Sequence, residues 1–307
     1  MTFEAALGEL TDPSQRPTAQ QLVDFSNLDE DESRRLADAW PEIDSSRRFA
    51  LLSTLTDMAQ DNVELNFDAV FKTALQDETP ELRAAGLRGL FEYEGRDLIP
   101  RLPELLREDP DADVRREAAI SLGRYAVEAE LGNLRSGDRE AIKSALIECA
   151  EDLEEDEKVR ARAIEALGAI SGEDTENLIE SIYHEESPWL KVGAVDAMGR
   201  SASELWLPIV LREMENPAPE MRHAAAFAAG QIGDEEAIGP LKQLVGLDRD
   251  RDVQLAAISA LGEIGGAHAR VALKSLLYEG DDDLHEAIQE AITEIAYQDD
   301  LMTPPGL

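Results

Sequence analysis

The sequence has few of the residues that build disulfide frameworks or zinc sites. Among 307 residues there are one cysteine and four histidines. Cys149 lies in an apolar run (AIKSALIECA), where cysteine usually packs as a small hydrophobe. Scattered histidines without paired cysteines exclude a zinc finger or ribbon. We therefore expect no disulfide framework, no metal and no cofactor.

Long apolar runs and long alternating runs are also missing. No 18 consecutive residues are apolar, so no transmembrane helix is expected. The N-terminus (MTFEAALGELTDPS) has neither the basic region nor the long apolar core of a secretory signal. A cytoplasmic protein is therefore expected. No segment alternates with a period of two for long enough to indicate a β-sheet.

Positive charge is scarce, with 29 basic against 66 acidic residues and a net charge of −37. This charge repels phosphates, so neither nucleic acid nor an anionic membrane is expected as a partner. The favoured explanation is a solvated exterior that keeps the chain soluble and monomeric. A basic partner or adaptation to a salty cytoplasm are the alternatives, and the excess of Glu over Asp gives the latter little support.

The sequence does contain one short pattern, repeated seven times. A large aliphatic residue is followed by a basic or polar one and then by a small-residue stretch that ends in Ala-Leu-Gly-x-Ile or a variant. Copies begin at Leu82, Val114, Val159, Leu190, Met221, Val253 and Leu284. Starts lie 31 or 32 residues apart, except for the 45 residues between Val114 and Val159. Such a period is typical of stacked repeats.

Each repeat reads as two helices joined by a short turn. In the copy from Val253 to Gly265, apolar residues recur at spacings of three and four, and glycines end the segment. A second apolar stripe precedes it, across the polar turn 248–250. Small residues such as Ala197 and Ala228 allow close helix contact, and stacking buries faces that one pair leaves open. The sequence therefore predicts an all-α protein.

The repeated helix, together with Asp-Pro-Asp-like turns at 109–111 and 216–219, resembles the HEAT repeat. More narrowly, it resembles the short HEAT-like repeat named after phycobilisome lyases. The resemblance covers roughly residues 67–297 and implies an armadillo-type, right-handed α-α superhelix. It implies no particular activity, because the family mostly supplies scaffolds and binding surfaces, with a few enzymes among them.

The chain is divided on this basis into a cap, an array and a tail. Residues 1–66 are expected to form a helical cap with a degenerate repeat, plugged by Trp40 and Phe49. Residues 67–297 form the array of about seven units, with an insertion at about 125–138 that we expect as a loop or an extra turn. Residues 298–307 are expected to form a flexible tail.

An iron-dependent enzyme is the sharpest catalytic alternative. The HEAT-like deoxyhypusine hydroxylases carry His-Glu pairs on their repeat helices and bind two irons between them. His-Glu occurs here at 184–185 and 285–286, but both pairs are out of register with that motif. His223 is in register, yet Ala224 stands where the Glu should be. No base is evident beside Cys149, and the glycines of 262–266 follow a helix rather than a strand. We therefore expect no catalytic site.

A basic residue occupies the second position of most copies. These residues are Arg83, Arg115, Arg160, Lys191 and Arg222, with Gln254 and His285 in the last two copies. They could form a cationic stripe for an acidic ligand. The favoured interpretation is that acidic turn residues just upstream pair with them from unit to unit. Those acids are Asp77, Asp109, Asp113 and Asp156.

The third, seventh and eleventh positions of the repeated helix lie opposite its buried stripe and should face the concave side. In the outer repeats these positions are charged. In the middle they are Val192, His223, Phe227 and Leu255. An apolar patch in a charged surround is typical of a protein-binding site. The alternative, weighed equally, is that these residues pack inside.

Together these patterns favour a non-catalytic scaffold or adaptor that binds another protein, of unidentified and perhaps basic character, through its concave face. One alternative is an enzyme or enzyme subunit, similar to bilin lyases or to metal-dependent hydroxylases. The other is a charge-driven, chaperone-like holder of a basic partner, for which strong salt dependence of capture would be diagnostic.

Overall fold

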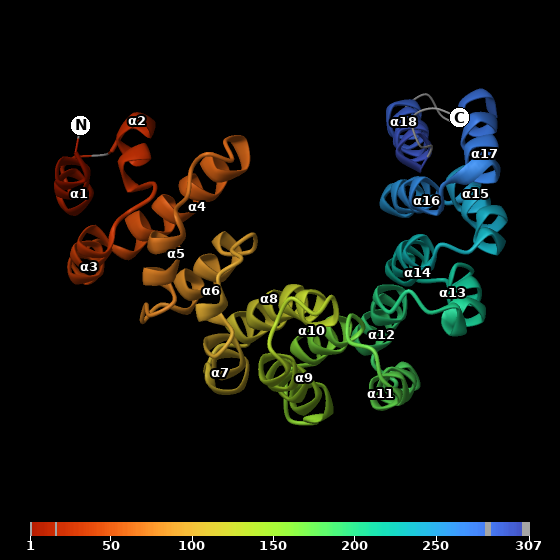
Figure 1. The fold of residues 1–307 in the computed structure, drawn as a ribbon, viewed down its shortest axis with the longest axis horizontal. Helices are drawn as coiled ribbons and strands as arrows, with labels where there is room; N and C mark the ends of the chain where they lie inside the picture. Colours follow the sequence, from red (N-terminus) through yellow and green to blue (C-terminus); the bar gives the residue numbers. More distant parts are fainter. Residues whose placement is uncertain (1, 16, 280–283, 303–307) are drawn as a thin grey trace. The chain divides into compact units, whose positions relative to one another are not determined.

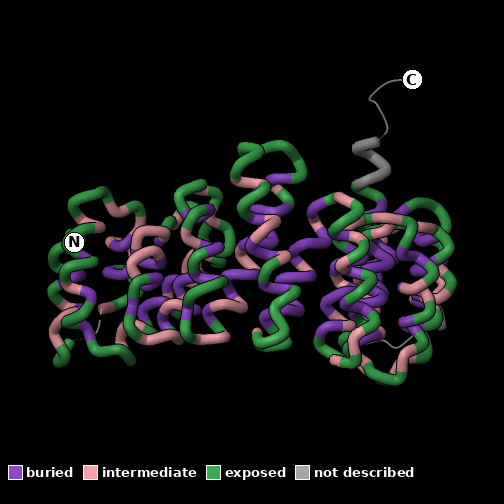
Figure 2. The backbone as a smooth tube through the Cα atoms, turned by 90° about the horizontal axis from the view of Figure 1, so that it is seen from below, coloured by how far each residue is buried: buried purple, intermediate pink, exposed green. Residues whose placement is uncertain are grey.

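The structure is a computed structural model that describes residues 2–15, 17–279 and 284–302. Within these residues the protein is all-helical, as the repeat pattern predicts. The chain forms two compact units, residues 1–122 and 123–307, and the division falls inside helix α8 (Ala112–Glu130). Figure 2 shows buried residues along the middle of the helices and exposed residues at the turns on both edges.

In the N-terminal unit, helices stack in two layers. Helix α3 packs against α5, and α4, which contains the segment predicted as a degenerate repeat, packs against α6. Short 3-10 turns occur at Val23–Phe25, Trp40–Glu42 and Arg96–Leu98. Before α8 the helices are α1 (Phe3–Thr11), α2 (Ala19–Leu22), α3 (Glu30–Ala39), α4 (Ser45–Asp61), α5 (Asp68–Ala74), α6 (Pro80–Gly89) and α7 (Arg101–Glu108).

The cap is closed differently from the sequence prediction. Trp40 is buried as expected, and its indole Nε1 donates to the Asp77 carboxylate over 2.6 Å. Phe49 as a plug is wrong, because its side chain is 49% exposed. The buried stripe of α4 runs through Leu51, Leu52 and Leu55 and leaves Phe49 beside it. The end is sealed instead by α1, whose Phe3 meets Phe25 edge to face.

In the C-terminal unit, the second helices of successive pairs pack against one another from α10 to α18. Figure 1 shows α12, α14, α16 and α18 on the inner side of this unit and α11, α13, α15 and α17 on the outer side. After α8 the helices are α9 (Ser136–Glu151), α10 (Glu157–Leu167), α11 (Glu173–Tyr183), α12 (Pro188–Arg200), α13 (Leu207–Glu213), α14 (Pro219–Ile232), α15 (Ile238–Leu247), α16 (Arg251–Ile264), α17 (Gly266–Glu279) and α18 (His285–Met302).

The helix pairs number seven from α5–α6 to α17–α18, which confirms the predicted units. The predicted turns separate the two helices of each pair, apart from 280–283, which lie outside the described residues. The insertion at 125–138 mostly lengthens helices, because α8 continues to Glu130 and α9 begins at Ser136. The segment expected as a tail from 298 is helical to Met302, and 303–307 lie outside the described residues.

Glycine and alanine form the seam between successive second helices. A Cβ added to Gly199 of α12 would lie 2.5 Å from the Ala228 Cα of α14. One added to Gly168, at the end of α10, would lie 2.3 Å from the Ala197 main-chain oxygen. Real Cβ atoms do not approach so closely, so only glycine allows these contacts. The prediction of close approach at Ala197 and Ala228 is confirmed.

The basic residues of the second position hold neighbouring repeats together. Arg222 forms two hydrogen bonds with the Asp248 carboxylate, over 2.6 and 2.8 Å, and donates to the Asn216 main-chain oxygen over 2.9 Å. Arg83 binds Asp109 and the Asp77 main chain in the same way. The hydrogen bonds from Arg222 lower the pKa of Asp248. The structural interpretation of the ladder is therefore confirmed for these two arginines.

The acidic partner of each arginine, however, lies in the corresponding turn of the next repeat and not, as predicted, in the turn before its own helix. The turn before the helix supplies main-chain oxygens that accept hydrogen bonds from the same arginine. Arg160 follows the same arrangement, since it binds Glu185 in the turn of the next repeat over 2.9 Å and donates to the Ala150 main-chain oxygen over 2.9 Å. Two of the predicted partners are wrong. Asp113 binds Arg116 within its own helix, and Asp156 caps α10 by accepting from the Lys158 amide. At these two positions the need to cap or start a helix takes precedence over pairing between repeats.

Candidate functional site

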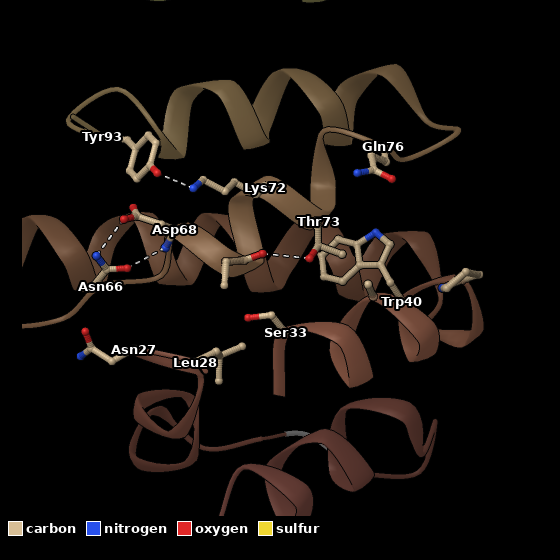
Figure 3. Close-up of a pocket in the computed structure, with 13 residues that line it drawn as sticks. Asn27, Leu28, Ser33, Trp40, Asn66, Asp68, Lys72, Thr73, Gln76 and Tyr93 are labelled. Atoms are coloured by element: carbon tan, nitrogen blue, oxygen red, sulfur yellow. Dashed lines mark hydrogen bonds between the residues drawn. The ribbon is translucent and has the colours of Figure 1, made fainter. Parts of the chain in front are cut away.

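The N-terminal unit contains a pocket of about 730 Å³ between α3 and α5. Figure 3 shows the side chains that line it, with hydrogen bonds between Lys72 and Tyr93 and between Asn66 and Asp68. Those labelled in it are Asn27, Leu28, Ser33, Trp40, Asn66, Asp68, Lys72, Thr73, Gln76 and Tyr93.

Most of the strong donors in this pocket serve the fold. Lys72 binds Asp97 over 2.8 Å and also the Tyr93 hydroxyl. Asn66 donates to Asp68 over 2.7 Å, and Thr73 donates to a main-chain oxygen of its own helix. The Trp40 indole donates its hydrogen bond to Asp77, in the turn between α5 and α6. A pocket whose polar groups are satisfied in this way is better explained as a helix seam than as a ligand site.

The second large hollow, here called the central groove, lies on the inner side of the C-terminal unit and has a volume of about 760 Å³. Four successive second helices, α10, α12, α14 and α16, supply its walls. The predicted residues line it together: Val192, His223, Phe227 and Leu255.

These four side chains have the exposure expected of a surface patch. Val192 and Phe227 are half-buried, His223 is exposed, and Leu255 is 39% exposed. The adjacent Ala225 and Ile258, by contrast, are buried. The alternative that the four residues pack inside is therefore wrong. Their placement in one groove is shown, while binding of a protein there stays a prediction.

Charged side chains surround the apolar wall. Arg200 binds the Glu165 carboxylate over 2.6 Å, and Arg162 binds the same group. These are the two arginines of the groove, and both are held by one glutamate. The remaining charged lining residues are acidic, apart from the imidazole of His223. They are Asp196, Glu220, Asp250, Asp252 and Glu263.

Asp196 is the most perturbed of these acids. It lies on α12, one turn after Val192, and is half-buried. Within the described residues its carboxylate accepts no hydrogen bond. Burial and the nearby Glu165 carboxylate raise its pKa to about 7, against the opposing effect of Arg162 and Arg200. A perturbed acid in a groove is a candidate functional group.

The central groove continues toward the C-terminal end. An adjoining hollow of about 440 Å³ shares Leu255, Ser259 and Glu263 with it and is otherwise lined by α16 and α18. Its additional charged residues are Glu290 and Glu294. The inner side therefore continues to present carboxylates toward this end.

The sequence prediction missed Asp196 and Glu263. Counted from the first residue of each repeat copy, Asp196 is at the seventh position and Glu263 at the eleventh. The repeat register assigns both positions to the inner side. The register was thus sufficient to find them. What the sequence does not show is which carboxylates are bound by neighbouring side chains. Glu165 has two arginines, and Glu263 accepts from Gln231 over 2.8 Å.

The histidines weighed as metal ligands are dispersed. His184 is exposed and meets Tyr183 edge to face, and Glu185 beside it binds Arg160. His285 lines a different hollow from His223. Among the described residues, no three His, Cys, Asp or Glu side chains gather as they would around a metal ion. In the same residues, no helix is long and apolar enough to cross a membrane.

The sequence matches the profile of HEAT repeats at residues 67–143 and 207–293, more than half of the chain. It is 29% identical over 168 residues to a HEAT repeat-containing taxis protein of Halobacterium salinarum, which covers 54% of this chain and 35% of that protein. Over 109 residues it is 32% identical to deoxyhypusine hydroxylase of Cryptococcus neoformans, which covers 34% of this chain and 30% of the enzyme. The matches thus span about a third of each curated relative.

A solved structure agrees with this match. The complex of CpcE and CpcF of phycocyanin lyase from Nostoc sp. PCC7120 has a TM-score of 0.50 and 18% identity, over 74% of this chain and 94% of that chain. At this identity the likeness concerns the fold alone. The relatives include both enzymes and a protein named for taxis, so they share an architecture rather than an activity.

Proposed function

Since the chain belongs to the HEAT-repeat family, we propose that it is a non-catalytic scaffold that binds another protein through the central groove. The observation that carries the proposal is the shared exposure of Val192, Phe227 and Leu255 on three successive helices. Apolar side chains with a charged surround are typical of a binding surface. Because helices α12, α14 and α16 carry the patch, it is presented without prior ordering of a loop.

The side chains available in the groove support a binding role over a catalytic one. Both carboxylate oxygens of Glu165 are bound by arginines, which leaves neither directed at a substrate. Ser259 lines the groove, but within the described residues its hydroxyl has no hydrogen bond to a base. An activated nucleophile needs such a base within hydrogen-bond reach. Asp196 is therefore better assigned to recognition.

The decisive variant is Phe227→Asp. Phe227 is half-buried on the groove wall, so we expect the substitution to cost about 1–3 kcal/mol in stability and to leave the chain folded. We also expect it to abolish partner capture, because a central aromatic commonly supplies a large share of the interface energy. Thermal unfolding and affinity capture from source cells, with quantitative mass spectrometry, measure the two effects.

Val271→Asp is the matched control. Val271 is 67% exposed on the outer helix α17, so the same charge is added away from the groove. Capture should survive this change. If Phe227→Asp unfolds the central repeats, or captures the same proteins as the control variant, the groove is not the binding surface.

A further inference from the structure

The charge of the groove points to the chemistry of its occupant. Its two arginines are both bound to Glu165, and the other ionic lining groups, His223 apart, are carboxylates. The charged groups that the adjoining hollow adds, including Glu290, are all acidic. A surface with an apolar wall and an acidic rim is complementary to a segment that is apolar and positively charged.

Asp196 is the place in the groove where a positively charged group of the segment would bind. Its carboxylate lies in the wall beside Val192 and accepts no hydrogen bond within the described residues. A half-buried carboxylate without a hydrogen bond is costly to keep ionised, and a cationic ligand relieves that cost. The neighbouring Phe227 and Leu255 can cover the alkyl part of a long basic side chain.

We propose that the central groove takes a basic, partly apolar segment of the partner protein, with a lysine or arginine side chain paired to Asp196. An adjacent aliphatic or aromatic side chain of the segment packs on Phe227 and Leu255. The rest of the segment follows the acidic inner side toward Glu290. This inference rests on the proposed function, because it names the chemistry of the partner bound at that same surface.

The pairing makes binding depend on pH. Asp196 faces Arg162 and Glu165 from α10 and His223 from α14, and Arg200 follows it on its own helix. With a pKa of about 7 in the free protein, ionisation rises from about 10% at pH 6 to about 90% at pH 8. A cation that binds the ionised form should therefore bind up to about ninefold more tightly at pH 8.

The test is a display selection of random twelve-residue peptides on the whole chain, with counter-selection on Phe227→Asp. We expect the retained peptides to combine lysine or arginine with aliphatic or aromatic residues. Retained peptides that are neutral or acidic would overturn the basic-segment inference and leave the proposed function standing. If no peptide distinguishes the chain from Phe227→Asp, both proposals fail.

Affinities of the retained peptides at pH 6 and pH 8 then test the role of Asp196. Asp196→Asn should weaken a basic peptide about tenfold at pH 8 and remove most of the pH dependence. His223→Gln serves as the second variant, because histidine side chains also change charge near neutral pH. If the pH dependence survives in Asp196→Asn and disappears in His223→Gln, the pairing with Asp196 is wrong.

Discussion

At the scale of the residue, the same positions of the repeat serve different purposes in successive helices. The seventh position is Phe227 in α14 and Asp196 in α12, and both line the groove. Position in the repeat decides that a side chain faces inward. The identity of the residue then decides whether it supplies apolar area or charge. A single helix pair would supply only one of these.

Asp196 should lower stability at neutral pH. Its folded pKa of about 7 lies above the ordinary value of 3.8, so the folded state binds the proton more tightly than the unfolded chain does. The contribution of Asp196 to stability is then most favourable below about pH 4 and falls as pH rises toward 7. Asp196→Asn removes this loss. We expect it to raise the free energy of unfolding by about 1–2 kcal/mol at pH 8, and by less at pH 5.

Urea unfolding of the two proteins at pH 5 and pH 8 measures this difference. Asp252→Asn is a useful control, because Asp252 is an exposed acid of the same groove. A difference between Asp196→Asn and the parent protein that is equal at both pH values would contradict the assigned pKa.

At the scale of the element, second helices are held at short distance by glycine and alanine. Gly199→Ala should therefore destabilise the protein by about 1–3 kcal/mol, because the new Cβ meets the backbone of α14, which cannot move independently. Gly246→Ala is the matched control, since Gly246 lies in α15 with nothing within 4 Å of an added Cβ. That change should be neutral or stabilising by up to about 1 kcal/mol.

Thermal unfolding of the two variants tests the seam. Equal melting temperatures for Gly199→Ala and Gly246→Ala would mean that α12 and α14 are not in backbone contact. Ala228→Leu should be destabilising for the same reason, because Ala228 is fully buried against Gly199.

The arginine ladder provides a second element-scale prediction. Arg222 holds Asp248 of the next turn, and the Asp248 pKa is lowered by that contact. Stability from the pair is present above the unfolded pKa of the acid and is lost as pH falls through its folded pKa. Arg222→Gln should therefore cost about 1–3 kcal/mol at pH 7 and distinctly less at pH 3. A cost that does not change with pH would show that Arg222 acts through its main-chain contacts alone.

At the scale of the whole molecule, much of the fold could be predicted because the period is local. Each copy such as Val253–Gly265 carries its own stripe, small residues and turn, so seven similar units were evident from the sequence. The structure differs from the sequence prediction where a segment has no counterpart in the other repeats. The first helix, α1, and the extension of α8 from residue 125 to Glu130 lie outside the repeat pattern, and the exposure of Phe49 depends on which stripe α4 buries.

The candidate site was only partly predictable, for a related physical reason. The register identified the inward apolar residues, including Phe227, because helical spacing alone fixes their direction. It did not identify Asp196 as exceptional, since a pKa depends on burial and on neighbours from α10 that are distant in sequence. Packing between repeats, rather than any local pattern, creates that environment.

The net charge of −37 should also affect the stability of the whole chain. Repulsion among carboxylates is screened by salt, so melting temperature should rise by several degrees between low salt and about 1 M NaCl. It should then level off, because the Debye length at 1 M is only about 3 Å. A rise that continues steeply to 3 M would favour adaptation to a salty cytoplasm over simple screening.

The most direct test of the central claim is site-specific photocrosslinking in source cells. Phe227 is replaced by the similar p-benzoylphenylalanine, and Val271, on the outer side, is replaced in a parallel control. We predict cross-links at position 227 to one partner protein, at a segment that has lysine or arginine close to the cross-linked residue, and none of these at position 271. Cross-linking at 227 that is no greater than at 271 would contradict the claim that the central groove is the binding surface.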